Sequence, residues 1–216
     1  MHGAWHGGWC WNKLQSALVA EGIEARTLDL PSAGRPGGIA EDESAVRRAV
    51  SEIDGPVLVV AHSYGGIPVS QAVAESSNVV RLVYLAAFQL DAGESLLGYV
   101  GAPAPSEAPQ MQPVPDDPFT LFYGDVPREE AEEAAARLVP QSAKSFSDVL
   151  VRAGWHDVPS TYIICEQDQA LPVALQEALS TRATEVYRMD GSHSPFLAKP
   201  GELAALLAKI ASQPPS

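Results

Sequence analysis

The chain has 216 residues, of which 46% are hydrophobic and 19% are charged, and its net charge is −13. This length allows one domain with a sizeable core, and the composition is that of a globular chain rather than a disordered one. The negative charge argues against binding to nucleic acid or to an anionic membrane, because few basic side chains are available to neutralise phosphates.

The two cysteines, Cys10 and Cys165, predict no disulfide framework, and no Cys/His cluster has the spacing of a metal site. No apolar run approaches the roughly 20 residues of a membrane span, and the N-terminus lacks the pattern of a signal peptide. We therefore expect a cytoplasmic protein without metal or cofactor. The excess of arginine over lysine, with abundant alanine, indicates a bacterial origin. The sequence is compatible with a homodimer but does not fix the oligomeric state.

Short apolar runs alternate with helical patterns along the chain. In chain order, the patterns predict strands at 24–28, 56–61, 79–86, 161–165 and 185–189, and helices at 40–53, 66–75, 173–179 and 202–211. Such alternation is typical of an α/β fold with a mainly parallel sheet and helices on both faces.

The segment Gln89–Val158 interrupts this alternation. No strand is evident in it, six prolines fall within residues 103–118, and a charged helix is predicted at Arg128–Leu138. A long insertion in a compact α/β domain is usually a lid or a binding loop. We predict a small helical cap at about 89–158, entered through a mobile proline-rich segment, within a single domain spanning 1–216. A plain linker is the alternative.

Ser63 follows an apolar run and precedes Gly65, Gly66 and a helical pattern. Strand, sharp turn, serine, glycines and helix together form the context of a nucleophile elbow, which exposes the serine hydroxyl. Small residues are needed two positions before and after the serine, because strand and helix pass close together there. Gly65 meets this requirement, and Ala61 replaces the usual first glycine. The Tyr64 N–H then lies at a helix start, where it can stabilise an oxyanion. An ordinary strand–helix turn is the alternative for this motif alone.

A nucleophilic serine needs a base to take its proton and an acid to orient that base. In elbow-type enzymes these residues follow in the order serine, acid, histidine. Asp168 follows the predicted strand 161–165, and His193 follows the predicted strand 185–189. With Ser63, both lie beyond the C-terminal ends of parallel strands, where open α/β sheets build their sites. We therefore predict Ser63, His193 and Asp168 as the catalytic residues.

Five other titratable residues are weaker candidates. The His62 side chain should diverge from the adjacent Ser63 hydroxyl, and His156 lies at the end of the cap. Glu166 is predicted to be still on its strand, Asp190 is too near His193 in sequence, and Asp157 precedes a strand.

The first nine residues, MHGAWHGGW, form a loop rich in histidine and glycine that enters a helix. Such a loop can present the Ala4 N–H as a second oxyanion donor beside that of Tyr64. A disordered start of the chain is the alternative.

Five segments of the sequence, HGAWHGGWCW, AHSYGG, LVYLAAF with DAGESL, PSTYIICEQDQALP and GSHSPFLAKP, together carry a family resemblance. They resemble the plant methylesterase and hydroxynitrile-lyase branch of the α/β-hydrolases, with its bacterial esterase relatives. The resemblance covers almost the whole chain except the cap. It implies an α/β-hydrolase fold, Ser63 as nucleophile, Asp168 and His193 as acid and base, and the Ala4 and Tyr64 amides as the oxyanion hole.

Two positions separate this chain from the lyases of that branch. The lyases carry a threonine in the first loop and a lysine directly after the histidine, where this chain has Ala4 and Ser194. Without that lysine the sequence offers no obvious cation to stabilise a departing cyanide. The resemblance therefore implies ester hydrolysis and not the lyase reaction.

One family feature is not found in the chain. In the family a central strand runs directly into the His-Gly loop, whereas this sequence starts at Met1. Each unsatisfied N–H or C=O on the neighbouring strands would cost about 1–3 kcal/mol. We expect a start codon assigned too far downstream or a truncated fragment. In a complete chain, the two strands beside the gap would pair with each other and Ala4 would be poorly anchored.

The leading hypothesis is a serine-dependent hydrolase that cleaves a small, fairly apolar carboxylic ester through an acyl-enzyme. Trp155, Phe119 and Tyr123 of the cap are predicted to bind the substrate. Two alternatives stay open: a non-catalytic small-molecule binding protein, and a biosynthetic acyltransferase or cyclase that uses the same three residues.

Overall fold

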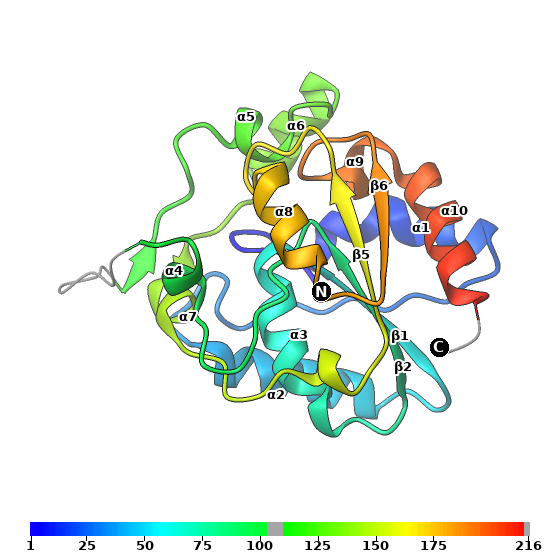
Figure 1. Cartoon of the computed structure of the whole chain (residues 1–216). Coiled ribbons are helices and arrows are strands. Elements are labelled where there is room, and N and C mark those ends of the chain that lie inside the picture. Colours follow the sequence, from blue (N-terminus) through cyan, green and yellow to red (C-terminus); the bar gives the residue numbers. More distant parts are fainter. Residues whose placement is uncertain (103–109, 214–216) are drawn as a thin grey trace.

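The computed structural model describes residues 1–102 and 110–213, and its centre is a sheet of four parallel strands (Figure 1). The strands lie in the order β1 (Val57–His62), β2 (Val79–Leu85), β5 (Ser160–Cys165) and β6 (Glu185–Met189). The register pairs His62 with Leu85 and Cys165 with Met189, so the C-terminal ends of the strands meet at one edge of the sheet.

Helices cover both faces of the sheet, as Figure 1 shows. Alternate side chains of β2 point to opposite faces. The covering helices are α1 (Asn12–Ala20), α2 (Ile39–Ser51), α3 (Gly66–Ala72), α8 (Val173–Ser180) and α10 (Pro200–Ala211). Leu82 and Tyr84 belong to the core beneath α2, α3 and α8, whereas Val83 and Leu85 belong to the core beneath α1 and α10. This arrangement confirms the predicted α/β architecture.

Short helical turns complete the connections between these elements. They are the 3₁₀ helices η1 (Gly8–Trp11), η2 (Ser63–Gly65), η3 (Val73–Glu75) and η4 (Gly154–His156) and the short helix α9 (Pro195–Ala198). Within the described part of the chain, no helix is both long enough and apolar enough to cross a lipid bilayer.

The predicted strand at 24–28 is wrong. These residues form no strand, and they do not pair with β1. The edge of β1 is instead taken by the start of the chain, where the Met1 nitrogen donates to the Val60 carbonyl and His62 N–H donates to the Met1 carbonyl. A strand requires backbone hydrogen bonds to a neighbouring strand, and residues 24–28 make none within the described part of the chain; the Ala25 carbonyl accepts from the Gln15 side chain instead.

The regular structure in the described part of the insertion between Gln89 and Val158 is mostly short helices joined by loops. One prediction for it is wrong: it contains two short strands, which pair antiparallel through Met111–Ser142 and Gln112–Gln141. Of the proline-rich segment that was expected to be mobile, residues 103–109 lie outside the described residues. The elements of the insertion are α4 (Leu96–Tyr99), β3 (Met111–Gln112), α5 (Pro118–Phe122), α6 (Arg128–Ala135), β4 (Gln141–Ser142) and α7 (Ala143–Ser147).

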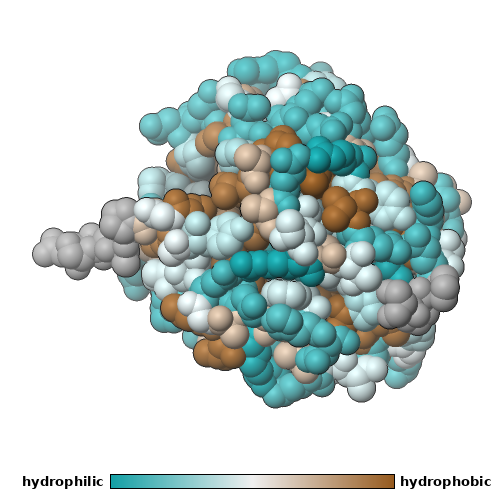
Figure 2. Space-filling model, in the orientation of Figure 1, coloured by the Kyte–Doolittle hydropathy of each residue, from teal (hydrophilic) through white to brown (hydrophobic). Residues whose placement is uncertain are grey.

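The surface is mixed in character. Figure 2 shows hydrophilic residues over most of one face, with hydrophobic residues in separate areas between them. Single exposed apolar side chains such as Val19 and Val151 are ordinary for a globular protein and do not by themselves indicate a subunit interface. The homodimer stays a prediction.

Candidate active site

Ser63 lies in a sharp turn, where β1 ends at His62 and η2 begins at Ser63 itself. Its φ of 51° is in the left-handed region, which a serine adopts only when its surroundings hold it there. The surroundings do so, because the Phe88 N–H donates to the Ser63 carbonyl at 3.1 Å and α3 follows directly. This is the backbone of a nucleophile elbow.

His193 and Asp168 form a buried hydrogen-bonded pair at the ends of β6 and β5. His193 Nδ1–H donates to Asp168 Oδ2 at 2.7 Å, and both side chains are almost completely buried. The Ala170 and Leu171 N–H groups donate to Asp168 Oδ1 at 2.8 and 2.9 Å, and the Gln176 amide donates to Oδ2 at 3.1 Å. The carboxylate is thus fixed by four donors, and it leaves His193 Nε2 available as a proton acceptor.

His193 lies beside the elbow. Its ring centroid is 4.4 Å from that of His62, the residue before Ser63. Within the described residues no hydrogen bond joins the Ser63 hydroxyl to His193 Nε2. Such bonds are often long without substrate and tighten when it binds. The structure therefore brings the three predicted catalytic residues to one place.

The weaker candidates have other partners. The His62 Nε2–H donates to the His193 carbonyl at 2.8 Å. His156 faces Asp91, and Asp190 faces Lys199. The prediction that Glu166 is still on its strand is wrong, because β5 ends one residue earlier at Cys165 and Glu166 pairs with Arg188.

The first loop lies directly against the elbow. A Cβ on Gly3 would stand 2.8 Å from the Ser63 Cβ, which only a glycine avoids. The Ala4 and Tyr64 N–H groups, the two predicted oxyanion donors, have no acceptor among the hydrogen bonds of the described residues. Both amides belong to buried residues, Tyr64 directly after Ser63 and Ala4 in the loop that packs against it, and a ligand oxygen could accept from them.

A buried carboxylate that the sequence analysis missed anchors the Tyr64 side of the elbow. Asp42 on α2 accepts hydrogen bonds from the Tyr64 hydroxyl at 2.6 Å and the Ser32 hydroxyl at 2.5 Å. Burial raises the pKa of Asp42. In the sequence, Asp42 is a single acidic residue on the otherwise apolar face of a helix. It belongs to no motif with a characteristic spacing, so the sequence did not single it out.

The three predicted substrate-binding residues occupy different environments. The Trp155 indole donates to the Leu90 carbonyl, Phe119 packs under the Arg128 guanidinium, and Tyr123 is buried with its hydroxyl on His6. The insertion contributes a nearer ring, that of Phe122, whose centroid is 5.9 Å from that of His193.

The cap also contacts the loop that carries the histidine. The Asp125 carboxylate accepts hydrogen bonds from the backbone N–H and the hydroxyl of Ser192. This contact joins the cap to the residue before His193, and it was not foreseen from the sequence, because Asp125 and Ser192 are 67 positions apart.

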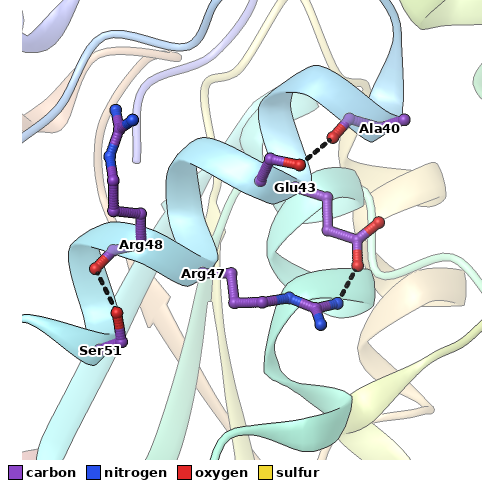
Figure 3. Close-up of a pocket in the computed structure, with 6 residues that line it drawn as sticks. Ala40, Glu43, Arg47, Arg48 and Ser51 are labelled. Carbon is purple, nitrogen blue, oxygen red and sulfur yellow. Dashed lines mark hydrogen bonds and ion pairs between the residues drawn. The ribbon is translucent and has the colours of Figure 1, made fainter.

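A surface hollow of about 600 Å³ lies apart from these residues, along α2. Figure 3 shows that Arg47 and Glu43 in its lining pair with each other, while Arg48 extends separately. None of the predicted catalytic residues lines it, so it takes no part in the chemistry considered below.

Three buried histidines near the elbow make the stability of the fold dependent on pH. Burial lowers the pKa of His2 to about 4 and that of His6 to about 3, and it holds the pKa of His62 well below its usual range. In the unfolded chain each ring has a pKa of about 6.5. The unfolded state therefore binds more protons than the folded state between pH 6.5 and the folded pKa, and stability falls as the pH falls through that window.

We expect the free energy of unfolding to fall below about pH 6.5, by about 1.4 kcal/mol per pH unit for each of the three rings. Urea unfolding at about pH 7.5, 6 and 5 measures this slope. The His6→Asn variant should show a slope smaller by about 1.4 kcal/mol per pH unit, because it lacks one titrating group; the buried Met1 amino group, whose pKa burial lowers to about 5, adds to the slope in both proteins. Asp42, whose raised pKa acts in the opposite direction, reduces the loss. A stability that stays constant from pH 6.5 to 5 would contradict this prediction.

Comparisons with known proteins agree with the fold. Residues 1–206 match a family model described as the alpha/beta hydrolase family. Methylesterase 7 of Arabidopsis thaliana is 29% identical over 99% of this chain and 95% of its own length, and norfluorocurarine synthase 2 of Strychnos nux-vomica is 28% identical over 99% and 94%. The solved structure of the methylesterase MES16 from Arabidopsis has a TM-score of 0.84 at 25% identity, with 98% of this chain and 97% of that chain covered. These findings confirm the resemblance drawn from the sequence.

Proposed function

Because the chain belongs to the alpha/beta hydrolase family and is an enzyme of the hydrolase kind, we propose that it cleaves a small carboxylic ester with Ser63 as nucleophile. The observation that carries the proposal is the buried 2.7 Å hydrogen bond between His193 and Asp168, beside an elbow that holds Ser63 at a φ of 51°. The esterases among the relatives support the same reaction class.

In the proposed reaction the Ser63 hydroxyl attacks the ester carbonyl while His193 Nε2 takes its proton. The tetrahedral oxyanion binds the Ala4 and Tyr64 N–H groups, and Asp168 stabilises the charged imidazole. His193 then returns the proton to the leaving alcohol, and an acyl-enzyme remains on Ser63. Water, activated by the same histidine, releases the acid and restores the serine.

A small and fairly apolar ester fits the aromatic surroundings of His193. Phe122 lies 5.9 Å from the His193 ring centroid and 5.8 Å from that of Trp5, and both rings belong to segments next to the elbow. Apolar rings of this kind bury an acyl or alcohol group while the polar groups orient its carbonyl. The role of Trp155, Phe119 and Tyr123 in substrate binding stays a prediction.

We expect a fluorophosphonate probe to form a covalent adduct with the native protein at Ser63, detected by mass spectrometry of the labelled peptide. The serine oxygen replaces fluoride on phosphorus, and His193 takes the hydroxyl proton. Ser63→Ala should prevent the adduct. The matched control is Ser194→Ala, because the Ser194 hydroxyl is buried without a hydrogen-bond partner and its loss should leave labelling intact. A folded wild type that binds small esters yet is never labelled would instead be the non-catalytic binding protein.

A biosynthetic enzyme with the same three residues is the second candidate, since norfluorocurarine synthase 2 is among the relatives. Product analysis distinguishes the two. With a p-nitrophenyl ester, a hydrolase yields the free acid at the rate of nitrophenol release. An acyltransferase would release nitrophenol slowly until an acceptor alcohol or amine is added, and the acyl group would then be recovered as the new ester or amide instead of the free acid.

A further inference from the structure

Two histidines of the first loop have no role in the proposed reaction, yet both are buried and hydrogen-bonded through both ring nitrogens. His2 and His6 are 1% and 2% exposed. Burying a polar ring is costly unless its nitrogens find partners. The partners of these two rings therefore indicate what the rings do.

The partners of His2 fix its tautomer. Nδ1 lies 2.8 Å from the Gly3 carbonyl oxygen, and Nε2 lies 2.8 Å from the Leu30 backbone nitrogen. A carbonyl oxygen only accepts and a backbone N–H only donates, so Nδ1 carries the proton and Nε2 is unprotonated. Burial, which lowers the pKa of His2 to about 4, keeps the ring neutral at physiological pH.

His6 has the same tautomer with different partners. Its Nδ1 lies 2.8 Å from the Ala4 carbonyl oxygen and must donate to it. Its Nε2 then accepts the Tyr123 hydroxyl proton at 2.9 Å, so a cap residue completes the arrangement.

These two bonds hold consecutive peptide groups on either side of Ala4. The Gly3 carbonyl belongs to the planar peptide group whose N–H is that of Ala4, and N–H and C=O point in opposite directions in a trans peptide. The next peptide group is held at both ends, by His6 on the Ala4 carbonyl and by the Trp5 N–H, which donates to Gln141 Oε1 at 3.2 Å. The left-handed φ of 62° at Trp5 is thereby maintained.

We propose that His2 and His6 are positioning residues that orient the Ala4 N–H as an oxyanion donor by donating their Nδ1 protons to the carbonyls on either side of it. The inference rests on the proposed hydrolase function. A donor that is fixed before the substrate binds needs no reorganisation when the oxyanion forms. A hydrogen bond to the carbonyl of the same peptide group also polarises its N–H.

Two replacements of His2 separate this role from a structural one. In His2→Asn the side-chain nitrogen can occupy the place of Nδ1 and still donate to Gly3, while the partner of Leu30 is lost. In His2→Gln the side-chain oxygen can occupy the place of Nε2 and still accept from Leu30, while the donor to Gly3 is lost. We expect His2→Asn to keep kcat for p-nitrophenyl acetate within about threefold. His2→Gln should lose at least about tenfold, up to the 10²–10³ lost when an oxyanion donor is removed, with KM unchanged.

The tautomers give a readout that does not depend on activity. The ¹⁵N spectrum of the folded wild type should show His2 and His6 neutral, with the proton on Nδ1. A proton on Nε2 of either ring would overturn the proposal even if a His2 variant failed to fold.

The outcomes also separate this inference from the proposed function. A wild type that hydrolyses the ester, with His2→Asn and His2→Gln equally active, would refute the positioning role alone. A folded wild type with neither hydrolysis nor labelling of Ser63 would refute the hydrolase, and with it the oxyanion role of both histidines.

Discussion

Replacing Asp168 with asparagine should lower kcat for p-nitrophenyl acetate by about 10⁴ while the protein stays folded. Asp168 Oδ1 accepts two backbone N–H groups, and Oδ2 accepts the His193 Nδ1 proton at 2.7 Å. Asparagine has one side-chain oxygen, and the two backbone donors require it at Oδ1. Its NH₂ group then faces His193 and forces Nδ1 to become the acceptor. The histidine proton moves to Nε2, which can no longer take the proton of Ser63.

The matched control is Asp190→Asn, three residues before His193. Asp190 is exposed and pairs with Lys199 on the surface, so its charge is screened by solvent and its loss should leave kcat unchanged. Thermal unfolding of both variants shows whether any loss of activity comes from the fold. If Asp168→Asn kept wild-type turnover, the orienting role of Asp168 would be wrong.

The relative placement of Asp168 and His193 could be predicted because it depends on local patterns. Each follows a short apolar run that is buried on a parallel strand, and parallel strands bring their C-terminal ends to one edge of the sheet. Chain order did not separate Asp168 from the nearby Glu166 and Asp190. Glu166 was set aside because it was expected to be on its strand, which is wrong, and Asp190 because it is close to His193; the hydrogen bond to His193 is made by Asp168.

The segment at 24–28 could not be assigned from its own residues. Its composition favours a strand, but a strand forms only where a neighbour offers backbone hydrogen bonds. At the corresponding edge of β1, Met1 makes the backbone contacts instead. The outcome was decided by residues far away in the sequence.

The polar contacts that stabilise the elbow and its loops could not be predicted either, because they also join residues that are distant in the sequence. Asp42 accepts a hydrogen bond from the Tyr64 hydroxyl, and Gln141 accepts one from the Trp5 N–H. The partners in each pair are far apart in the sequence, and the hydrophobic periodicity of a segment does not predict which distant segment it contacts. Single polar residues in helices and loops are mostly on the surface, so a sequence alone gives no reason to single these out. Their burial and their partners appear only once the layers are assembled.

Gly65→Ala should impair both stability and turnover, although alanine suits its backbone. Gly65 has a φ of −56°, in the helical region, so the exchange brings no backbone strain and would favour a helix by about 1 kcal/mol. A Cβ at this position, however, would lie 2.5 Å from the His2 carbonyl oxygen and 3.1 Å from that of Met1. Both atoms are backbone and cannot rotate away. Overpacking of this kind typically costs about 1–3 kcal/mol, so the clash outweighs the gain in propensity.

The effect of Gly65→Ala on activity depends on which backbone group the clash displaces. Relief of the clash must move the backbone at His2, and the Gly3–Ala4 peptide group that carries the proposed oxyanion donor moves with it. A misplacement of about 1 Å in a catalytic group can cost about 10² in rate, so we expect kcat for p-nitrophenyl acetate to fall about 10²-fold at a nearly constant KM. Gly201→Ala is the control, because a Cβ there meets nothing within 4 Å and should leave kcat unchanged. If Gly65→Ala were as active and as stable as Gly201→Ala, the first loop would not need its close contact with the elbow, and the oxyanion role of Ala4 would lose its structural basis.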